Sequence, residues 1–381
     1  MIRTPPQYCP ILRLKKSELE AVCKLREEVS LFVRPIFELV PEHFYDYEKG
    51  ADKKYKKDSE GNYIRKNKDP KAVLEKKAHD LLDNYGYDRP AAIDFSRLTG
   101  EIWFPYEGHP LDIFYQEAQT RGLWIIPVTG LSTSYQSPEY MDALKRFVEN
   151  DIDRGIVIRL YQEDMQKDGF PTLLQNICLD AKIPLGKVDI LLDYRYISSK
   201  PLEIVETINS FPELGQWRTL TLIMGAMPNH EQYQFHANDS YEFERHDFQA
   251  WLDILDDVRR IPDYGDYTIL SPTYKEYLPS FATPSAKIVW TTQTKFLMER
   301  GISLKNGKKG EQFIDLSRLI PLHDEFKDSL LSNCHGDNYL LETLDGSKPT
   351  PKRAKWLQQW IATGINHHIS LTVYQLASVF S

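Results

Sequence analysis

Short apolar runs of strand length alternate along most of the chain with segments of helical periodicity. The run that begins at Pro10 is followed by helical spacing at Leu19, Val22 and Cys23, and a second run begins at Pro35. Further apolar runs begin at Ala91, Leu123, Ile156, Val188, Thr219 and Tyr267. Strands that alternate with helices form parallel βαβ units, so the pattern predicts a parallel sheet covered by helices.

Eight such runs, spread over roughly 270 residues, match a closed barrel in both number and length. The sequence therefore predicts an α/β fold, a (β/α)8 TIM-type barrel. A doubly wound open sheet is the alternative. That fold more often has a glycine-rich phosphate-binding turn after its first strand, whereas the turn here reads KKSELE and contains no glycine.

We expect a single domain over residues 1–381, with a barrel core of about residues 8–280. A long insertion after the second strand covers about residues 41–70, and a C-terminal decoration covers about 281–381. Within the decoration, KIVWTTQ is typical of a strand and FIDLSRLIPLHDEFKDSLL of a helix. The last segment predicts two helices, or a helix and a strand, separated near Gly364. Part of it should supply the eighth barrel helix.

The insertion is polar and has no apolar periodicity, which indicates a solvated loop. Its lysines and arginines are mixed with acidic residues, and its aromatic side chains between them are limited to Tyr55 and Tyr63. A nucleic-acid-binding site is the alternative, but that class of site needs more aromatic residues interleaved with the basic ones. The solvated loop is the favoured interpretation.

Composition narrows the class of protein. Of 381 residues, 41% are hydrophobic and 27% charged, which is typical of a soluble globular protein. The formal net charge of −8 argues against broad binding of nucleic acid or anionic membranes. No apolar run is long enough to cross a bilayer, and the N-terminal residues lack the apolar region of a secretory signal. Four scattered cysteines fit neither a disulfide framework nor a zinc ribbon, so a cytoplasmic location with reduced thiols is expected.

Charged residues interrupt the predicted strands with a period of two. Strand side chains alternate between faces, and a barrel strand turns its apolar face toward the helices, so the charged face should point into the barrel. This places two opposite sets of charge in one interior: Arg13, Lys15, Arg159 and Arg195 against Glu38, Asp94, Asp189 and Asp193. The formal charges cancel, as a buried ionic network requires.

Two interpretations of this interior stay open. One is a structural plug of salt bridges that fixes the barrel. The other is a polar pocket at the C-terminal rim, where barrel enzymes place their chemistry. In that pocket Glu38, Asp94 and Asp193 would be the catalytic carboxylates. Arg13, Lys15, Arg159, Asp189 and Arg195 would bind an anionic small molecule.

Other candidates for chemistry are weaker. His230, His236 and His246 lie around a polar segment after the seventh strand, which suggests a tyrosine-rich loop more than a metal site. His367 and His368 are adjacent and should diverge rather than bind one metal. Phosphate-binding loop, nucleophile-elbow and zinc-protease patterns are absent from the sequence. We therefore expect no metal site, and no cofactor is indicated.

Several short motifs resemble the Beta protein family of bacterial and satellite-phage proteins. The opening YCPILRLKKSELEAVCKL…VRPIFEL has the family's order of strand, Glu-rich helix and strand. Later matches are IDFS near Asp94, YGDYTILSP at 264–272, HGDNYL at 335–340 and WIATGINHHISLTVYQLAS at 360–378. The matches span nearly the whole chain. One departure is Cys334-His335, which stands before Gly-Asp where the family pattern has an aromatic residue.

The resemblance implies a protein encoded in a small anti-phage cassette of mobile elements. Family members are associated there with restraining a toxic partner encoded alongside, an antitoxin-like or sensing role. The resemblance also marks six residues as important, in a structural or a binding role: Lys15, Glu38, Asp94, Asp337, Asn366 and His367.

Two functions from different classes follow. The first is a protein-binding barrel that restrains a partner from the same cassette. The second is a barrel enzyme, hydrolase or phosphodiesterase-like, that acts on a phosphorylated or nucleotide-like small molecule at the barrel mouth. Whether the chain is an enzyme is left open by the sequence. The two hypotheses differ in one structural respect: the second needs carboxylates at the rim that are not locked in ion pairs.

Overall fold

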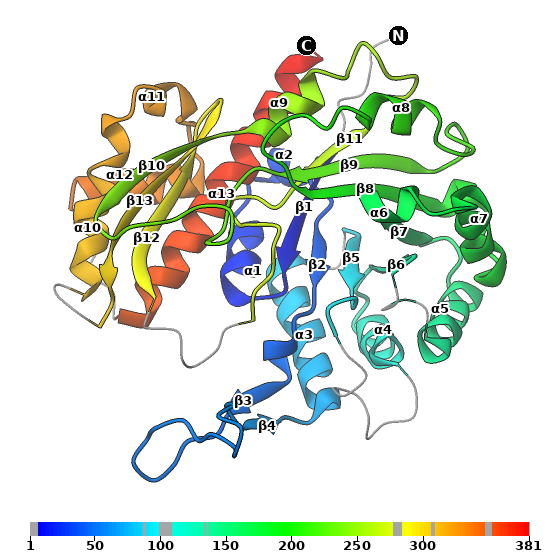
Figure 1. The fold of residues 1–381 in the computed structure, drawn as a ribbon, viewed down its shortest axis with the longest axis horizontal. Helices are drawn as coiled ribbons and strands as arrows, with labels where there is room; N and C mark the ends of the chain where they lie inside the picture. The colour runs from blue at the N-terminus through cyan, green and yellow to red at the C-terminus, as the bar shows by residue number, and fades with distance from the viewer. Residues whose placement is uncertain are drawn as a thin grey trace.

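Eight parallel strands close into a barrel, which confirms the predicted α/β class and TIM-type architecture (Figure 1). Around the barrel they follow the order β1-β11-β9-β8-β7-β6-β5-β2, and β2 pairs with β1 to close the ring. Their bounds are β1 (Tyr8–Arg13), β2 (Ile36–Glu38), β5 (Ala91–Asp94), β6 (Ile125–Gly130), β7 (Ile156–Tyr161), β8 (Val188–Tyr196), β9 (Thr219–Gly225) and β11 (Asp263–Asp266). The computed structural model describes residues 7–86, 89–98, 109–132, 135, 137–276, 284–305, 309–346 and 353–380.

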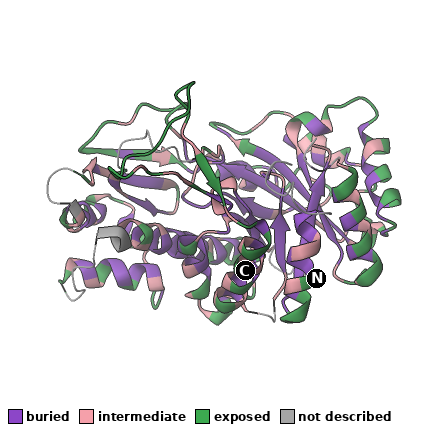
Figure 2. Ribbon diagram, turned by 90° about the horizontal axis from the view of Figure 1, so that it is seen from below, coloured by how far each residue is buried: buried purple, intermediate pink, exposed green. Residues whose placement is uncertain are grey.

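Helices connect successive strands and cover the outside of the barrel. They are α1 (Lys16–Cys23), α2 (Glu27–Ser30), α3 (Pro70–Tyr85), α4 (Pro110–Thr120), α5 (Pro138–Asn150), α6 (Gln162–Met165), α7 (Phe170–Asp180), α8 (Ile204–Asn209) and α9 (His246–Leu252). Their inner faces are buried and their outer faces exposed (Figure 2). This division is what an amphipathic helix on a sheet requires.

Local signals in the sequence set several helix ends. The Ser137 hydroxyl accepts a hydrogen bond from the backbone N–H of Tyr140, and Pro138 takes the first helical position of α5. A side-chain acceptor before a proline is a strong start signal because it satisfies an orphan N–H of the first turn. At the other end of a helix, α3 stops at Gly86, whose φ of 94° glycine adopts with little strain.

The first seven barrel strands begin within two residues of the predicted positions. The eighth does not: the strand expected from Tyr267 is β11, Asp263–Asp266, and Tyr267 follows it. Its sequence, DYGD, lacks the β-branched residues that mark a strand. It contains Gly265 because a Cβ there would meet the backbone oxygen of Cys9 at 2.7 Å. The close approach of neighbouring strands therefore requires a glycine here, and a glycine weakens the sequence signal for a strand.

A second, smaller module lies beside the barrel (Figure 1). It consists of an antiparallel sheet in the order β10-β13-β12 and three short helices, of which α10 packs on β12 and β13. Its elements are β10 (Asp239–Glu244), β12 (Ser285–Thr291), β13 (Lys295–Ser303), α10 (Gln312–Ser317), α11 (Phe326–Ser329) and α12 (His335–Leu344). We call these elements the C-terminal module. They enclose a separate apolar cluster that includes Trp290, Phe313 and Trp360.

Two expectations about the C-terminal module were wrong. The segment 313–331, predicted to be one helix, is broken into α10, a 3-10 turn (Ile320–Leu322) and α11, with Pro321 inside the turn. The tyrosine-rich segment after the seventh strand contains β10 and is not only a loop. Tyr241 and Phe243 alternate there with Ser240 and Glu242, a period of two that is typical of a strand.

The chain ends in one long helix, α13 (Arg353–Val379), and the predicted break near Gly364 is wrong. A Cβ on Gly364 would lie 2.6 Å from the backbone oxygen of Val289, in β12. Glycine is therefore required for close packing of helix on sheet and does not end the helix. The same helix packs against α1, so it supplies the eighth barrel helix as expected. Helix α13 therefore joins the core of the barrel to that of the C-terminal module.

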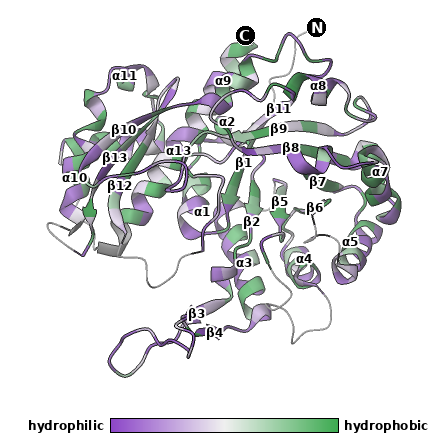
Figure 3. Ribbon diagram, viewed as in Figure 1, coloured by the Kyte–Doolittle hydropathy of each residue, from purple (hydrophilic) through white to green (hydrophobic). Residues whose placement is uncertain are grey.

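The insertion after the second strand is an extended arm rather than a bare loop (Figure 1). A 3-10 turn (Pro41–His43) leads into β3 (Tyr45–Tyr47), which pairs antiparallel with β4 (Arg65–Asn67). Beyond this pair, isolated bridges join Lys49 to Tyr55 and Lys57 to Tyr63. We call residues 45–67 the arm. Most of it is exposed and hydrophilic, in keeping with the predicted solvation (Figure 3).

The expected boundary of the C-terminal decoration, at residue 281, lies outside the described residues. Across the part of the chain that the structure describes, no helix has both the length and the apolar character needed to cross a bilayer.

Candidate functional site

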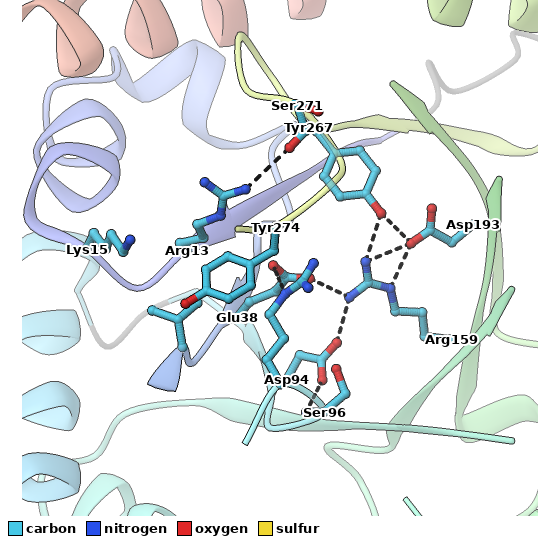
Figure 4. A network of polar contacts seen from close by, with 12 residues as sticks. Arg13, Lys15, Glu38, Asp94, Ser96, Arg159, Asp193, Tyr267, Ser271 and Tyr274 are labelled. Carbon is cyan, nitrogen blue, oxygen red and sulfur yellow. Dashed lines mark hydrogen bonds and ion pairs between the residues drawn. The ribbon is translucent and has the colours of Figure 1, made fainter. Parts of the chain in front are cut away.

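The charged positions of the barrel strands meet inside the barrel, as the alternation predicts. Four of the predicted residues form one buried group, which we call the central network: Glu38, Asp94, Arg159 and Asp193. They come from β2, β5, β7 and β8, respectively, each near the C-terminal end of its strand. Their side chains are at most 2% exposed. Strands distant in sequence therefore deliver one ionic cluster to the barrel axis (Figure 4).

Arg159 contacts all three carboxylates. Its Nη1 donates to Glu38 Oε1 at 2.9 Å and to Asp94 Oδ2 at 2.7 Å. Its Nε donates to Asp193 Oδ2 at 2.8 Å. Hydrogen bonds between charged groups are stronger than neutral ones, and guanidinium geometry suits several carboxylates at once. One arginine thus fixes the relative positions of four strands.

Further residues that sequence reasoning missed complete the central network. Arg97 Nε donates to Glu38 Oε2 at 2.7 Å. Tyr135 donates to Asp94 Oδ1 at 2.9 Å, and Tyr267 donates to Asp193 Oδ2 at 2.6 Å. These three residues lie after their strands, where the period of two no longer indicates which way a side chain points.

Ion pairing dominates the acidity of the buried glutamate. Burial by itself raises the pKa of Glu38, but Arg97 and Arg159 outweigh burial and bring the pKa down to about 2. Burial lowers the pKa of Arg159, but Tyr161, Tyr267, Asp193 and Glu38 together hold it well above its ordinary value. A carboxyl with so low a pKa stays ionised at neutral pH, so Glu38 cannot act as a general acid there.

Asp189 and Arg195, predicted for the same interior, lie elsewhere. Asp189 is the second residue of β8, so it faces the opposite end of the barrel, where Arg218 binds it through two donors at 2.8 and 2.7 Å. Arg195 follows a shift in strand register and has a φ of 55°. The bulge breaks the alternation, so Arg195 turns outward and pairs with the exposed Glu163.

Arg13 and Lys15 lie at the mouth of the barrel, outside the central network (Figure 4). Arg13 donates to the backbone oxygen of Ser271 at 3.3 Å and lies over the ring of Tyr274. Lys15 follows the end of β1 and pairs with Glu42 at 3.7 Å, with 37% of its side chain exposed. The predicted set of eight is thus divided among the axis, the mouth, the far end and the outer surface of the barrel.

Comparison with known families supports the motifs quoted above. The Beta protein family model matches residues 8–373, nearly the whole chain. The chain belongs to the Beta protein family. No curated protein matches it.

The other residues marked by the resemblance to Beta proteins form a second buried group, far along the chain. Asp337 Oδ1 lies 2.9 Å from Nδ1 of His367, and both side chains are at most 1% exposed. Asn366 accepts a hydrogen bond from Gly336 N at 2.9 Å and donates to the backbone oxygen of Ala21. This group therefore ties α12 and α13 to α1, at the joint between the module and the barrel.

A third buried group, on the outer face of the barrel, was not predicted. Asp266, at the end of β11, accepts from Tyr8 at 2.5 Å and from Tyr264 at 3.0 Å. His368 Nε2 lies 2.8 Å from its Oδ2, and His368 Nδ1 lies 2.9 Å from the Thr291 hydroxyl. The adjacent histidines of α13 thus diverge, as the sequence indicates, one toward α12 and the other toward the barrel.

Among the described residues, one group of three side chains has donor atoms close enough to hold a metal: Cys334, Asp337 and His367. His230, His236 and His246, which the sequence analysis weighed as a metal site, do not form such a group. His246 begins α9, and His230 and His236 belong to the segment between β9 and β10. The signal for the real group was present as Cys-x-x-Asp, but its histidine lies thirty residues further on, and only the packing of α12 on α13 joins them.

Proposed function

We propose that this Beta protein is a non-catalytic, protein-binding barrel of an anti-phage cassette that restrains a toxic partner encoded beside it. The observation that carries the proposal is the saturation of the central network. Each of its carboxylates accepts a hydrogen bond from Arg159 and from at least one further donor. General acid–base chemistry needs a carboxyl whose proton is exchangeable with a substrate, and these groups are buried and occupied.

The arm supplies a suitable contact surface for a polypeptide. Tyr47, Tyr55 and Tyr63 pack edge to face with ring centroids 6.0 to 6.4 Å apart. Lys49 and Lys57 lie over the rings of Tyr55 and Tyr63 at 4.8 and 4.7 Å. Preordered tyrosines that combine apolar area with a polar edge are favoured in binding surfaces because little entropy is lost when they are fixed.

The root of the arm is anchored, which presents its tip in a defined direction. Glu276, in the segment after β11, accepts hydrogen bonds at its Oε1 from Tyr45, Tyr47 and Arg65. Nearby, Tyr274 donates to Glu42. An arm fixed at its base and exposed at its tip resembles other binding loops positioned by rigid scaffolds.

The hollow between the arm and the barrel mouth fits a polypeptide better than a polyanion. It has a volume of about 850 Å3 and is lined by charges of both signs: Lys15, Lys49 and Lys66 with Glu42, Asp46 and Glu48. A site for a phosphorylated ligand needs a surplus of cations. Balanced charge instead suits a partner surface that carries both signs.

One observation favours the small-molecule alternative. The guanidinium groups of Arg13 and Arg97 lie 5.4 and 5.0 Å from the ring of Tyr274, at the barrel mouth. Two arginines around one aromatic ring can bind a planar anionic group. We therefore keep an enzymatic or sensing role toward a phosphorylated small molecule as a second candidate, with the anion at the mouth rather than in the central network.

Native mass spectrometry of the chain, alone and co-expressed with its neighbouring genes, tests the proposal. We expect a stoichiometric complex with one neighbour that is lost in Tyr55→Ala. Tyr374→Ala is the matched control, because Tyr374 on α13 is 41% exposed and Tyr55 is 40% exposed. A complex that survives Tyr55→Ala would move the contact surface away from the arm. A retained phosphorylated ligand and no protein complex would replace the proposal by the second candidate.

A further inference from the structure

The junction of α12 and α13 brings three side chains of metal-ligand type together. Cys334 caps the N-terminus of α12, Asp337 lies one turn further on the same helix, and His367 lies in the middle of α13. Gly336 permits the contact, because a Cβ there would meet the backbone oxygen of Thr363 at 2.6 Å. We call Cys334, Asp337 and His367 the junction cluster.

The junction cluster is fully enclosed. Cys334, Asp337 and His367 are 3%, 1% and 0% exposed, and one donor atom of each lies within 4.8 Å of the others. The indole of Trp290 stacks on the His367 ring with centroids 4.0 Å apart. Buried polar atoms of this kind are expected to have partners, since an unsatisfied one costs free energy.

Two atoms of the junction cluster nevertheless lack a hydrogen-bond partner: Asp337 Oδ1 and His367 Nδ1. They lie 2.9 Å apart, at ion-pair distance, but without the geometry of a hydrogen bond. A third partner bound between these ligand atoms would explain why two buried atoms lie so close without a hydrogen bond.

The remaining atoms of these side chains are held so that the convergent atoms stay in place. His367 Nε2 lies 2.8 Å from the backbone oxygen of Thr291, which orients the ring. Asp337 Oδ2 accepts from Leu331 N at 3.3 Å, which leaves Oδ1 for the cluster. A ligating histidine almost always donates its other ring N–H to a carbonyl or carboxylate in this way.

We propose that the junction cluster binds a divalent transition metal of the zinc class through Cys334 Sγ, Asp337 Oδ1 and His367 Nδ1. Thiolate, imidazole and carboxylate are zinc ligands, and the thiolate disfavours magnesium and calcium. Thiolate and carboxylate together carry two negative charges, which neutralise a divalent cation in a site that excludes water. The carboxamide oxygen of Asn366, which accepts a hydrogen bond from Cys334 Sγ at 3.5 Å, is a further oxygen ligand beside the cluster.

Such a metal has a structural role. It links α12 to α13, and through Thr291 it also fixes β12, so it joins the C-terminal module to the eighth barrel helix. The inference departs from the expectation, made from the sequence, that the chain has no metal site. It is independent of the proposed partner binding, because the junction cluster is buried and shares no residue with the arm.

The test uses full-length protein purified without chelators or a metal-binding tag. We expect about one zinc per chain by elemental analysis, as a single structural site requires. After removal of the metal, added Co²⁺ should give an absorption band of thiolate-to-cobalt charge transfer. The expected band needs no substitution, so this measurement does not depend on a variant that folds.

Cys334→Ser should abolish the charge-transfer band and lower bound zinc at least tenfold. Cys178→Ser is the matched control, because Cys178 is also a buried free thiol but lies on α7, apart from the cluster. It should keep both signals. Wild-type protein with neither zinc nor a cobalt band would overturn the inference, as would a Cys334→Ser variant that retains both.

Discussion

The barrel centre and the junction cluster both bury charged side chains, but they satisfy them differently. In the central network each carboxylate is bound by donors from neighbouring elements. In the junction cluster Asp337 Oδ1 and His367 Nδ1 face one another without a hydrogen bond.

A saturated network stabilises one arrangement of strands, whereas convergent unsatisfied atoms indicate a site for a third partner. Position in the fold does not separate the two cases. The saturated network lies near the C-terminal ends of the barrel strands, the end at which barrel enzymes work, and the unsatisfied cluster lies between two helices. Contacts at each atom therefore say more about function here than the fold does.

The largest effect is expected from Arg159→Met. Removing the guanidinium leaves Glu38, Asp94 and Asp193 buried without their common cation, and breaking one buried pair already costs about 3–5 kcal/mol. We expect no accumulation of folded protein. Soluble yield and circular dichroism after expression measure this, and a folded variant of normal stability would show that the central network is not a scaffold.

The pH dependence should follow Glu38. Its pKa is lowered from 4.5 to about 2 in the folded protein, so its contribution is complete above pH 4.5 and is lost as pH falls through 2. A shift of this size corresponds to about 3 kcal/mol. Urea unfolding of wild type and Glu38→Gln should differ most at neutral pH and converge toward pH 2. A difference in unfolding free energy that did not change with pH would show that the ion pairs of Glu38 do not stabilise the fold.

A smaller effect is expected from Gly364→Ala, which tests the contact between the two cores. The added methyl would lie 2.6 Å from the Val289 oxygen, and such overpacking costs about 1–3 kcal/mol. Gly215→Ala is the control, because a Cβ there has no neighbour within 4 Å. Equal thermal unfolding of the two variants would show that α13 does not need its close approach to β12.

The smallest effect is expected from Arg195→Ala. Arg195 was predicted to face the barrel interior, but it pairs with Glu163 on the surface, where both side chains are about half exposed. Exposed pairs contribute about 0–1 kcal/mol. If Arg195→Ala lowered the free energy of unfolding as much as a central-network variant does, Arg195 would have to belong to the interior.

Alternation of apolar and polar residues was enough to predict the barrel and the inward direction of Glu38, Asp94, Arg159 and Asp193, because the period of two is set by strand geometry itself. Prediction failed where close packing or a bulge, and not the alternation of residues, determined the backbone conformation. Close approach selected Gly265 in β11 and Gly364 in α13, and a bulge turned Arg195 outward. Residues beyond the strand ends, such as Arg97 and Tyr267, carry no periodic signal.

The junction cluster shows a different limit. Cys334 and Asp337 lie three residues apart, but their partner His367 comes from another helix. The resemblance marked Asp337 and His367 as important without giving them a role. Only the packing of α12 on α13 shows which of their atoms are unsatisfied, and this is tertiary information that no spacing rule contains.

The unfolding free energy of Asp193→Asn tests the central claim most directly, because it removes one charge while it keeps the shape of the side chain. If the central network is a saturated scaffold, the substitution costs about 3 kcal/mol or more in urea unfolding, since Arg159 loses a buried counter-charge. Asp153→Asn is the control, because Asp153 pairs with Lys187 at the surface. An Asp193→Asn variant as stable as Asp153→Asn that no longer restrains the partner would contradict the account and make the barrel centre a functional site.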